Sequence, residues 1–164
     1  MCDPDLNVWK GEENISPDPV IFGNLRSCGG HVSIGYDNPK EEISEEIVKA
    51  FDLFCTLPSL LLDPDTERRQ LYGKAGSFRF KNFGVECRSL SNFWLISEAY
   101  MAWVFDQTQK AIDYINSGKG VKGDLAAMLP VAIDENNKDL AAIICREHKI
   151  ELPEVIETFS KATI

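Results

Sequence analysis

The strongest pattern in the sequence is an alternation of polar and apolar residues in two short runs. The polar members are Ser77, Arg79 and Lys81 in the first run and Glu86 and Arg88 in the second, and the apolar members are Phe78, Phe80, Val85 and Cys87. Side chains in a β-strand point to opposite faces in turn, so each run predicts a strand with one charged and one apolar face. Asn82-Phe83-Gly84 lies between the runs and predicts a tight turn, with Gly84 at positive φ. Together they predict a β-hairpin.

A third alternating run lies upstream, over residues 30–36. His31 and Ser33 share one side of this run, and Val32, Ile34 and Tyr36 share the other. A charged strand face can be no more than the solvated side of an antiparallel sheet, and that interpretation stays open. Three runs that each place polar side chains on one face favour another interpretation, in which they form the floor of a site.

Helical periodicity follows the third run and the hairpin. Helices are predicted over residues 41–56, 66–72, 92–116 (with Ser91 as N-cap), 136–148 and 153–161. Residues 2–9 could form a short strand, residues 14–24 predict a loop, and residues 118–133 predict a mobile connection. This order predicts an α+β domain, an antiparallel β-sheet with helices packed on one face.

Composition narrows the function classes. The chain has 164 residues, which fits one domain, and a net charge of −9 without a basic block. This charge argues against nucleic acid or an anionic membrane as partner, and the longest apolar run, residues 57–62, is too short to span a bilayer.

Cysteine usage indicates the cellular compartment. The five cysteines are odd in number and form no CxxC pair, so with no signal peptide we expect reduced thiols in the cytoplasm. Zinc bound through Cys28 and His31 would lack two further ligands at suitable spacing.

Three stretches carry a family resemblance: GGHVSIGY, LDPDTERRQLYGKAGSFRFK and FGVECRSLSNFW. They resemble the phage and bacterial amidoligases of the phiEco32-like type 2, carboxylate–amine ligases related distantly to glutamine synthetase and glutamate–cysteine ligase. The resemblance covers residues 2 to about 117. It implies an amidoligase-like catalytic region over residues 1–117, with the fold of a glutamine synthetase-like catalytic half, followed by a helical C-terminal extension over residues 118–164.

The resemblance also implies ATP-dependent amide-bond formation through an acyl phosphate, with ATP, Mg²⁺, a carboxylate and an amine as ligands. By position in the motifs, His31 and Glu86 would bind metal, and Arg79 and Arg88 would be catalytic cations. Arg79 would also bind phosphate, with Lys74 and Arg69 as further phosphate candidates; the alternative for Arg69 is a surface arginine on a charged turn. Asp3 or Asp5 could face the site.

Two departures from the family limit this expectation. Ser33 stands where the family often has a second histidine, and serine is a poor metal ligand. Family members also begin with an additional N-terminal segment whose opening strand carries acidic metal ligands, and nothing before Met1 supplies it. We therefore expect the C-terminal portion of an amidoligase: a gene fragment, half of a split enzyme that needs an N-terminal partner chain or a homo-oligomer, or a degenerate copy. The alternative is a non-catalytic module that binds nucleotide, a peptide or a phage component.

Overall fold

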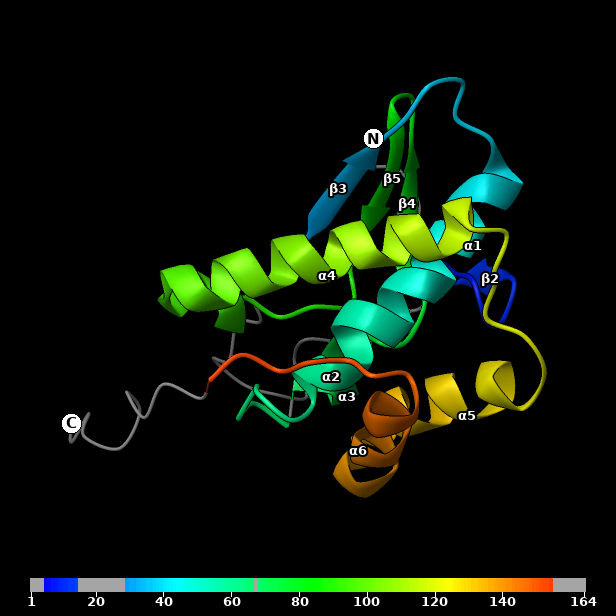
Figure 1. Ribbon diagram of the computed structural model, residues 1–164. Coiled ribbons are helices and arrows are strands. Elements are labelled where there is room, and N and C mark those ends of the chain that lie inside the picture. Colours follow the sequence, from blue (N-terminus) through cyan, green and yellow to red (C-terminus); the bar gives the residue numbers. More distant parts are fainter. Residues whose placement is uncertain (1–4, 15–28, 67, 155–164) are drawn as a thin grey trace.

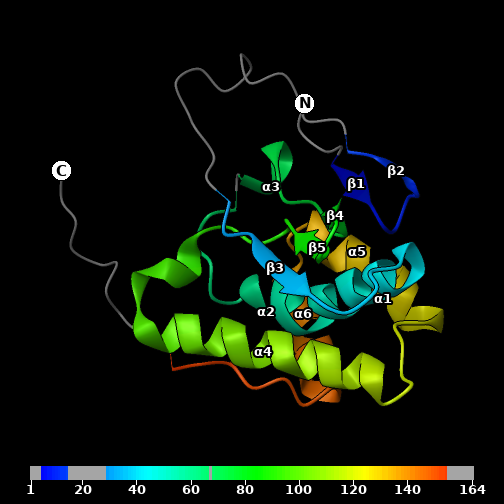
Figure 2. The same ribbon diagram turned by 90° about the horizontal axis from the view of Figure 1, so that it is seen from above.

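The computed structural model describes residues 5–14, 29–66 and 68–154. These residues form an α+β fold around a five-stranded antiparallel sheet (Figures 1 and 2). The strands are β1 (Leu6–Asn7), β2 (Glu12–Glu13), β3 (Val32–Gly35), β4 (Ser77–Lys81) and β5 (Gly84–Cys87). Their order in the sheet is β2-β1-β4-β5-β3, so β5 pairs with β4 on one side and with β3 on the other. The predicted α+β class with an antiparallel sheet is confirmed.

The register of the three central strands confirms the predicted faces. Glu86 lies opposite both Arg79 and Ser33, which places these three residues on one face of the sheet. The apolar pairs on the other face are Phe78 with Cys87, Phe80 with Val85, Val32 with Cys87 and Ile34 with Val85. One face of the sheet is therefore apolar and the other carries the charged side chains.

Gly84 closes the hairpin as predicted, at a φ of +148°. A Cβ atom at this position would lie 2.1 Å from the backbone oxygen of Ile34 on the neighbouring strand. Only glycine fits both the conformation and this close approach of β5 to β3.

Seven helical elements follow the chain within the described residues. They are α1 (Glu41–Phe51), which continues into a π-helical turn (Asp52–Thr56) and α2 (Leu57–Ser59), then α3 (Arg68–Leu71), α4 (Glu98–Asn116), α5 (Gly123–Asp134) and α6 (Lys138–Glu147). A 3₁₀ turn, Phe93–Ile96, precedes α4. None of these helices is long and apolar enough to cross a bilayer.

The apolar sheet face packs on α1 and α4. Ile47, Val48 and Phe51 of α1 are buried against Phe78 and Val85 of the sheet, and Tyr100, Trp103 and Val104 of α4 join the same core. The amphipathic pattern of α1 explains this arrangement, because its exposed Glu41 and Glu42 lie in the first turn while the apolar stripe faces inward. The charged side chains lie on the opposite face of the sheet.

A second core joins α2 to the C-terminal helices. Leu53, Leu57 and Leu60 are fully or almost fully buried against Leu129, Ala132 and Ile133 of α5 and Ala141, Ile144 and Cys145 of α6. The prediction of a mobile connection over residues 118–133 is therefore wrong. Leu129, Ala132 and Ile133 form the buried side of α5, and Pro130 is accommodated inside this helix.

The long helix begins later than predicted. Ser91 does not cap it: its hydroxyl donates to Asp63 and accepts from the Phe93 backbone N–H, and the chain then forms the 3₁₀ turn. Ser97, in extended conformation, is the N-cap of α4 and accepts from the Tyr100 N–H. The short strand expected over residues 2–9 is present as β1, and β1 pairs with β2, which was not predicted.

Several predictions fall outside the described residues. These are most of the loop predicted over 14–24, most of the helix predicted over 153–161, and the positions of Cys2, Asp3 and Cys28.

Candidate active site

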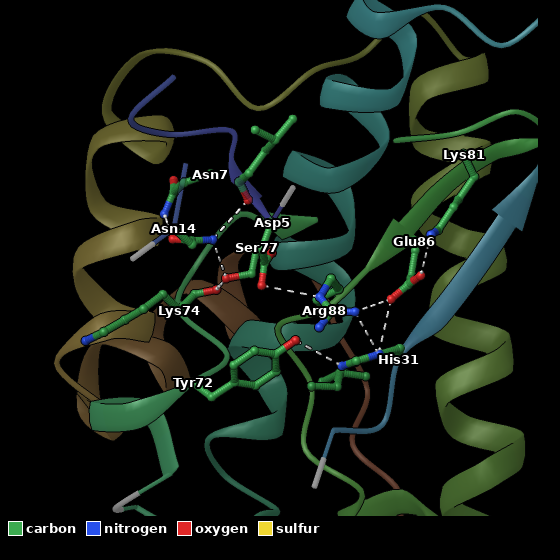
Figure 3. Close-up of polar contacts among 12 residues, drawn as sticks. Asp5, Asn7, Asn14, His31, Tyr72, Lys74, Ser77, Lys81, Glu86 and Arg88 are labelled. Atoms are coloured by element: carbon green, nitrogen blue, oxygen red, sulfur yellow. Dashed lines mark hydrogen bonds and ion pairs between the residues drawn. The ribbon is translucent and has the colours of Figure 1, made fainter. Parts of the chain in front are cut away.

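A connected polar network lies on the charged face of the sheet (Figure 3). Its centre is the guanidinium of Arg88, which donates from one Nη to Glu86 Oε1 in a very close contact and approaches Asp5 Oδ2 with Nε at 3.4 Å. The same Nη lies 3.2 Å from His31 Nδ1, and His31 Nδ1 lies 3.2 Å from Glu86 Oε1. The hydroxyl of Tyr72 is 3.3 Å from His31 Nε2. Residues from four separate segments thus meet around one cation.

Backbone pairing brings Asp5 into this network. The Arg88 N–H donates to the Ser77 carbonyl at 2.8 Å, so Arg88 continues the strand alternation that places Glu86 on the same face. Asn14 links β1 to β4, because its Nδ2 donates to the Leu6 carbonyl at 2.9 Å and to Ser77 Oγ at 3.1 Å. This link holds the start of β1, and with it Asp5, beside Arg88.

Glu86 is held in its charged form. Burial alone would raise the pKa of its carboxyl group, but the hydrogen bonds and charges of Arg88 and Lys81 outweigh burial and lower the pKa. Lys81 Nζ lies 3.4 Å from Glu86 Oε2, so each carboxylate oxygen faces a different cation. Both oxygens are therefore already engaged within the protein.

His31 is held in its neutral form. Burial lowers the pKa of its imidazole, and the positive charge of Arg88 lowers it further, against the opposing effect of Glu86. At neutral pH the contact between His31 and Glu86 therefore involves a neutral ring and is not an ion pair. In one tautomer Nδ1–H donates to Glu86 and Nε2 accepts from Tyr72; in the other Nδ1 accepts from Arg88 and Nε2–H donates to Tyr72.

Tyr72 covers one side of the network. Its ring lies between two guanidinium groups, with the Cζ of Arg88 at 5.4 Å and that of Arg68 at 5.3 Å from the ring centroid. Burial raises the pKa of its hydroxyl, and Arg88 opposes that rise. Tyr72 therefore reaches His31 as a neutral phenol at physiological pH.

Arg79 lies across the strand pair from Glu86. Its Nε is buried and has no hydrogen-bond partner in the part of the chain that the structure describes. A guanidinium carries five N–H donors, and a buried donor without a partner is costly. The Nε donor of Arg79 is thus unused within the described residues, and the side chain is half-buried on the charged face.

The other two phosphate candidates lie elsewhere. Arg69 is only 4% exposed, and its guanidinium donates to the Gly73 carbonyl at 2.9 Å and to Ser59 Oγ at 3.1 Å. It is therefore neither the expected surface arginine nor a cation presented to a ligand, because internal acceptors engage it. The side chain of Lys74 extends away from Arg88 and His31 (Figure 3), while its backbone carbonyl accepts from Ser77.

The donor set does not fit a metal centre built by the protein. His31 and Glu86 do lie together as predicted, but no group of three or more His, Cys, Asp or Glu side chains that could hold a metal occurs among residues 5–14, 29–66 and 68–154. The guanidinium of Arg88 also contacts both proposed ligands, at the place that a shared cation would take. Ser33, which stands where a further ligand is expected, is exposed and lies across from Glu86.

Sequence reasoning missed two members of this site. Lys81 follows the same alternation as Arg79, so the strand pattern contained the signal for its position. Tyr72 lies directly after α3 outside any periodic element, and only its spatial contacts with His31 and Arg88 identify it. Asp5 was one of two acidic candidates. The structure places Asp5 in the network, and Asp3 lies outside the described residues.

Comparison with known proteins gives a family. Residues 24–115, more than half of the chain, match the family described as phage phiEco32-like COOH.NH2 ligase-type 2. No curated protein and no solved structure matches the chain. The matched residues contain β3, β4 and β5 with His31, Arg79, Glu86 and Arg88, as well as α1 and most of α4. This chain therefore belongs to the phage phiEco32-like carboxylate–amine ligase type 2 family.

Proposed function

We propose that the charged face of the sheet is the active face of an ATP-dependent carboxylate–amine ligase with the architecture of a glutamine synthetase-like catalytic half. The family name supports ligation of a carboxyl to an amino group. The observation that carries the proposal is the pairing of Arg79 with Glu86, beside Arg88 and Lys81, on one face of an antiparallel sheet whose other face is filled by helices.

Three cations on one face suit the chemistry of phosphoryl transfer. The transferring phosphoryl group spreads negative charge over its oxygens, and preformed cations stabilise this charge without reorganisation. Arg79 has an unused buried donor, and Arg88 is fixed by Asp5 and Glu86. In the proposal Arg79 and Lys81 bind ATP phosphates, and Arg88, which is 7% exposed and held by Asp5 and Glu86, contributes positive charge near the substrate carboxylate or the acyl phosphate without binding it directly.

The reaction would proceed in two steps. First, a carboxylate oxygen of the substrate forms a bond to the γ-phosphorus of ATP, and the bond from that phosphorus to the bridging oxygen of ADP breaks. The amine nitrogen then attacks the carbonyl carbon of the acyl phosphate. The bond from this carbon to the phosphate oxygen breaks, phosphate leaves, and the amine proton is released to solvent. The products are an amide, ADP and phosphate.

Magnesium enters the proposal only with the nucleotide. Mg²⁺ commonly binds through substrate phosphates, waters and one or two carboxylates. Because Glu86 is engaged by Arg88 and Lys81, we derive no step through a metal ion. Within the proposal, His31 and Tyr72 serve to orient Arg88 and to limit access of water to it.

The proposal is tested by trapping the acyl phosphate. Purified chain is incubated with ATP, a panel of carboxylates and hydroxylamine, and hydroxamate and ADP are measured. The proposal expects ADP and hydroxamate in equal amounts, lost in Arg79→Ala and Glu86→Gln, and retained in Lys119→Ala, which removes an exposed lysine at the far end of α4.

Calorimetry with ATP separates the alternatives. Binding that is lost in Arg79→Ala, without turnover, would favour a nucleotide-binding module or a ligase that needs a second chain. Unchanged ATP affinity in Arg79→Ala, or no detectable binding, would refute the assignment of the charged face to ATP.

A further inference from the structure

Three side chains of types that commonly bind divalent metals surround the guanidinium of Arg88. Its Nε lies 3.4 Å from Asp5 Oδ2, and one Nη lies 3.2 Å from His31 Nδ1 and in very close contact with Glu86 Oε1. Figure 3 shows these three groups converging on Arg88. Carboxylate oxygens suit Mn²⁺, and an imidazole nitrogen suits most divalent transition metals. The cation at the centre of this set of potential ligands is therefore a side chain of the protein.

The spacing of these groups is close to that of ligands on one metal ion. Two neighbouring ligands that each lie about 2.1 Å from an octahedral ion are about 3 Å apart. His31 Nδ1 and Glu86 Oε1 are 3.2 Å apart. The other oxygen of Asp5, Oδ1, is buried and has no hydrogen-bond partner in the part of the chain that the structure describes. Asp5 thus has acceptor capacity that Arg88 does not use.

The sheet fixes the three potential ligands independently of the Arg88 side chain. Glu86 lies within β5, and His31 and Asp5 directly precede β3 and β1, whose registers are set by pairing with β5 and β4. The ring of His31 also packs on the backbone of Gly29, where an added Cβ atom would lie 2.3 Å from Nε2. These groups should therefore stay close together when the side chain of Arg88 is shortened.

The guanidinium is held in place and stays charged. Arg88 is almost fully buried, and its backbone N–H donates to the Ser77 carbonyl at 2.8 Å. Burial alone would lower the pKa of Arg88, but Tyr72, Glu86 and Asp5 outweigh burial and raise it. A divalent ion on the same carboxylate oxygens would meet this positive charge at close range, and like charges repel strongly where water is excluded. Arg88 and a metal ion therefore compete for one position.

We propose that Arg88 is a built-in replacement for a divalent metal ion, and that Asp5, His31 and Glu86 form a latent site for Mn²⁺ that opens when the guanidinium is removed. In the wild type the centre of the network then carries its positive charge covalently, whatever the concentration of free metal. This inference goes beyond the proposed ligase function and does not depend on it, because it concerns metal binding alone.

Binding of Mn²⁺ tests the proposal. Mn²⁺ is paramagnetic, so it broadens the NMR signals of nearby nuclei, and it prefers oxygen and imidazole ligands to thiolates. The chain without an affinity tag is titrated with Mn²⁺ at about pH 8, which keeps imidazoles unprotonated, and binding is followed by calorimetry and by the two histidine signals. In Arg88→Ala, one Mn²⁺ should bind and broaden the signal of His31, while that of His148 on the C-terminal side of α6 stays sharp. In the wild type, His31 should broaden no more than His148.

Further variants separate the roles of charge and ligands. Arg88→Lys keeps a cation and should not gain Mn²⁺ binding. Arg88→Ala combined with Glu86→Gln lacks one ligand and should bind Mn²⁺ at least about 10-fold more weakly than Arg88→Ala, because even partners behind the ligands contribute that much. Arg88→Gln takes the place of Arg88→Ala if that variant does not fold, since its neutral amide can still donate to Glu86.

Three results would overturn the proposal. The first is selective broadening of His31 by Mn²⁺ in the wild type, because metal and guanidinium would then share the site. The second is the absence of Mn²⁺ binding in folded Arg88→Ala or Arg88→Gln, and the third is equal binding in Arg88→Lys. None of these measurements needs turnover, so an inactive chain in the hydroxamate assay would refute the ligase proposal and leave this one standing.

Discussion

A buried carboxyl group beneath the sheet makes the stability of this protein depend on pH. Asp52 is fully buried in the π-helical turn, where its Oδ2 accepts from the Trp9 indole N–H at 2.7 Å and from the Gly76 N–H at 2.6 Å. Burial raises the pKa of Asp52 to about 6, and these hydrogen bonds only partly oppose the rise. Asp52 thus joins the N-terminal segment, the long helical run and the start of β4 through a group that prefers to be protonated.

The size of the effect follows from the two pKa values. The ordinary pKa is 3.8 and the folded value is about 6, a difference of about 2.2. At 1.36 kcal/mol for each pKa unit, this corresponds to about 3 kcal/mol. Because the pKa is raised in the folded protein, this stabilisation is fully present below pH 3.8 and is lost as the pH rises through about 6.

Asp52→Asn removes this dependence. The amide oxygen can still accept from Trp9 and Gly76, but the side chain no longer charges. Urea unfolding, followed by tryptophan fluorescence between pH 4 and pH 8, should show a steeper loss of stability in the wild type than in the variant. Because Asp52 in the unfolded chain already loses its proton near pH 3.8, part of this energy is gone at pH 4, and the difference between the two curves should change by about 2 kcal/mol over this range.

The surface variant Asp106→Asn provides the control, because Asp106 is exposed on α4 and should leave the curve parallel to that of the wild type. Curves for the wild type and Asp52→Asn that stay parallel across pH 4–8 would refute the argument from burial.

Three further changes probe the hairpin, the network and the C-terminal helices. Gly84→Ala should cost at least about 1–3 kcal/mol in the free energy of unfolding, because the new Cβ would meet a backbone oxygen at 2.1 Å from a φ of +148°. Arg88→Met should raise the pKa of His31, measured by NMR titration of the imidazole, because it removes a cation that lowers that pKa. Leu129→Ala should lower the free energy of unfolding by about 2–5 kcal/mol, because it opens a cavity between α2 and α5.

The two stability changes, at Gly84 and Leu129, each have a matched comparison. Gly118 also has positive φ, but an added Cβ there meets open space, so Gly118→Ala isolates backbone strain from the clash at Gly84. Val131 is 46% exposed on α5, and Val131→Ala should change stability far less than Leu129→Ala. A fall in the His31 pKa in Arg88→Met, or equal losses within either stability pair, would contradict the packing and charges described above.

The sequence predicted the part of the fold that depends on strand alternation. Alternation assigned both faces of β4 and β5 and their turn, and the same period placed Val32 and Ile34 of β3 on the apolar side. Strand periodicity is strong here because one face packs on helices and the other carries charge. β1 and β2 have only two residues each, too few to show a period, so the sequence suggested a strand over residues 2–9 without its bounds and did not predict β2.

The failures have local causes. Gly118 and Gly120 suggested that the long helix ends in a connection, yet tertiary burial of Leu129 and Ile133 stabilises α5 across Pro130. In the site, the motifs located His31 and Glu86 but could not show that Arg88 lies between them and Asp5, because that contact depends on residues 83 positions apart. Arg69 was misplaced because sequence alone does not distinguish a buried arginine with backbone acceptors from a surface one.

Because α2 and the C-terminal helices share one core, shortened versions of the protein should contain both. A recombinant fragment that stopped at the end of the family match would uncover Leu53, Leu57 and Leu60, and one that began at residue 24 would remove β1 and the preceding Asp5. Such a fragment should aggregate on expression, and inactivity measured on it would not test the proposed ligase activity. Cloning boundaries are better placed outside residues 5–154 than at the borders of sequence similarity.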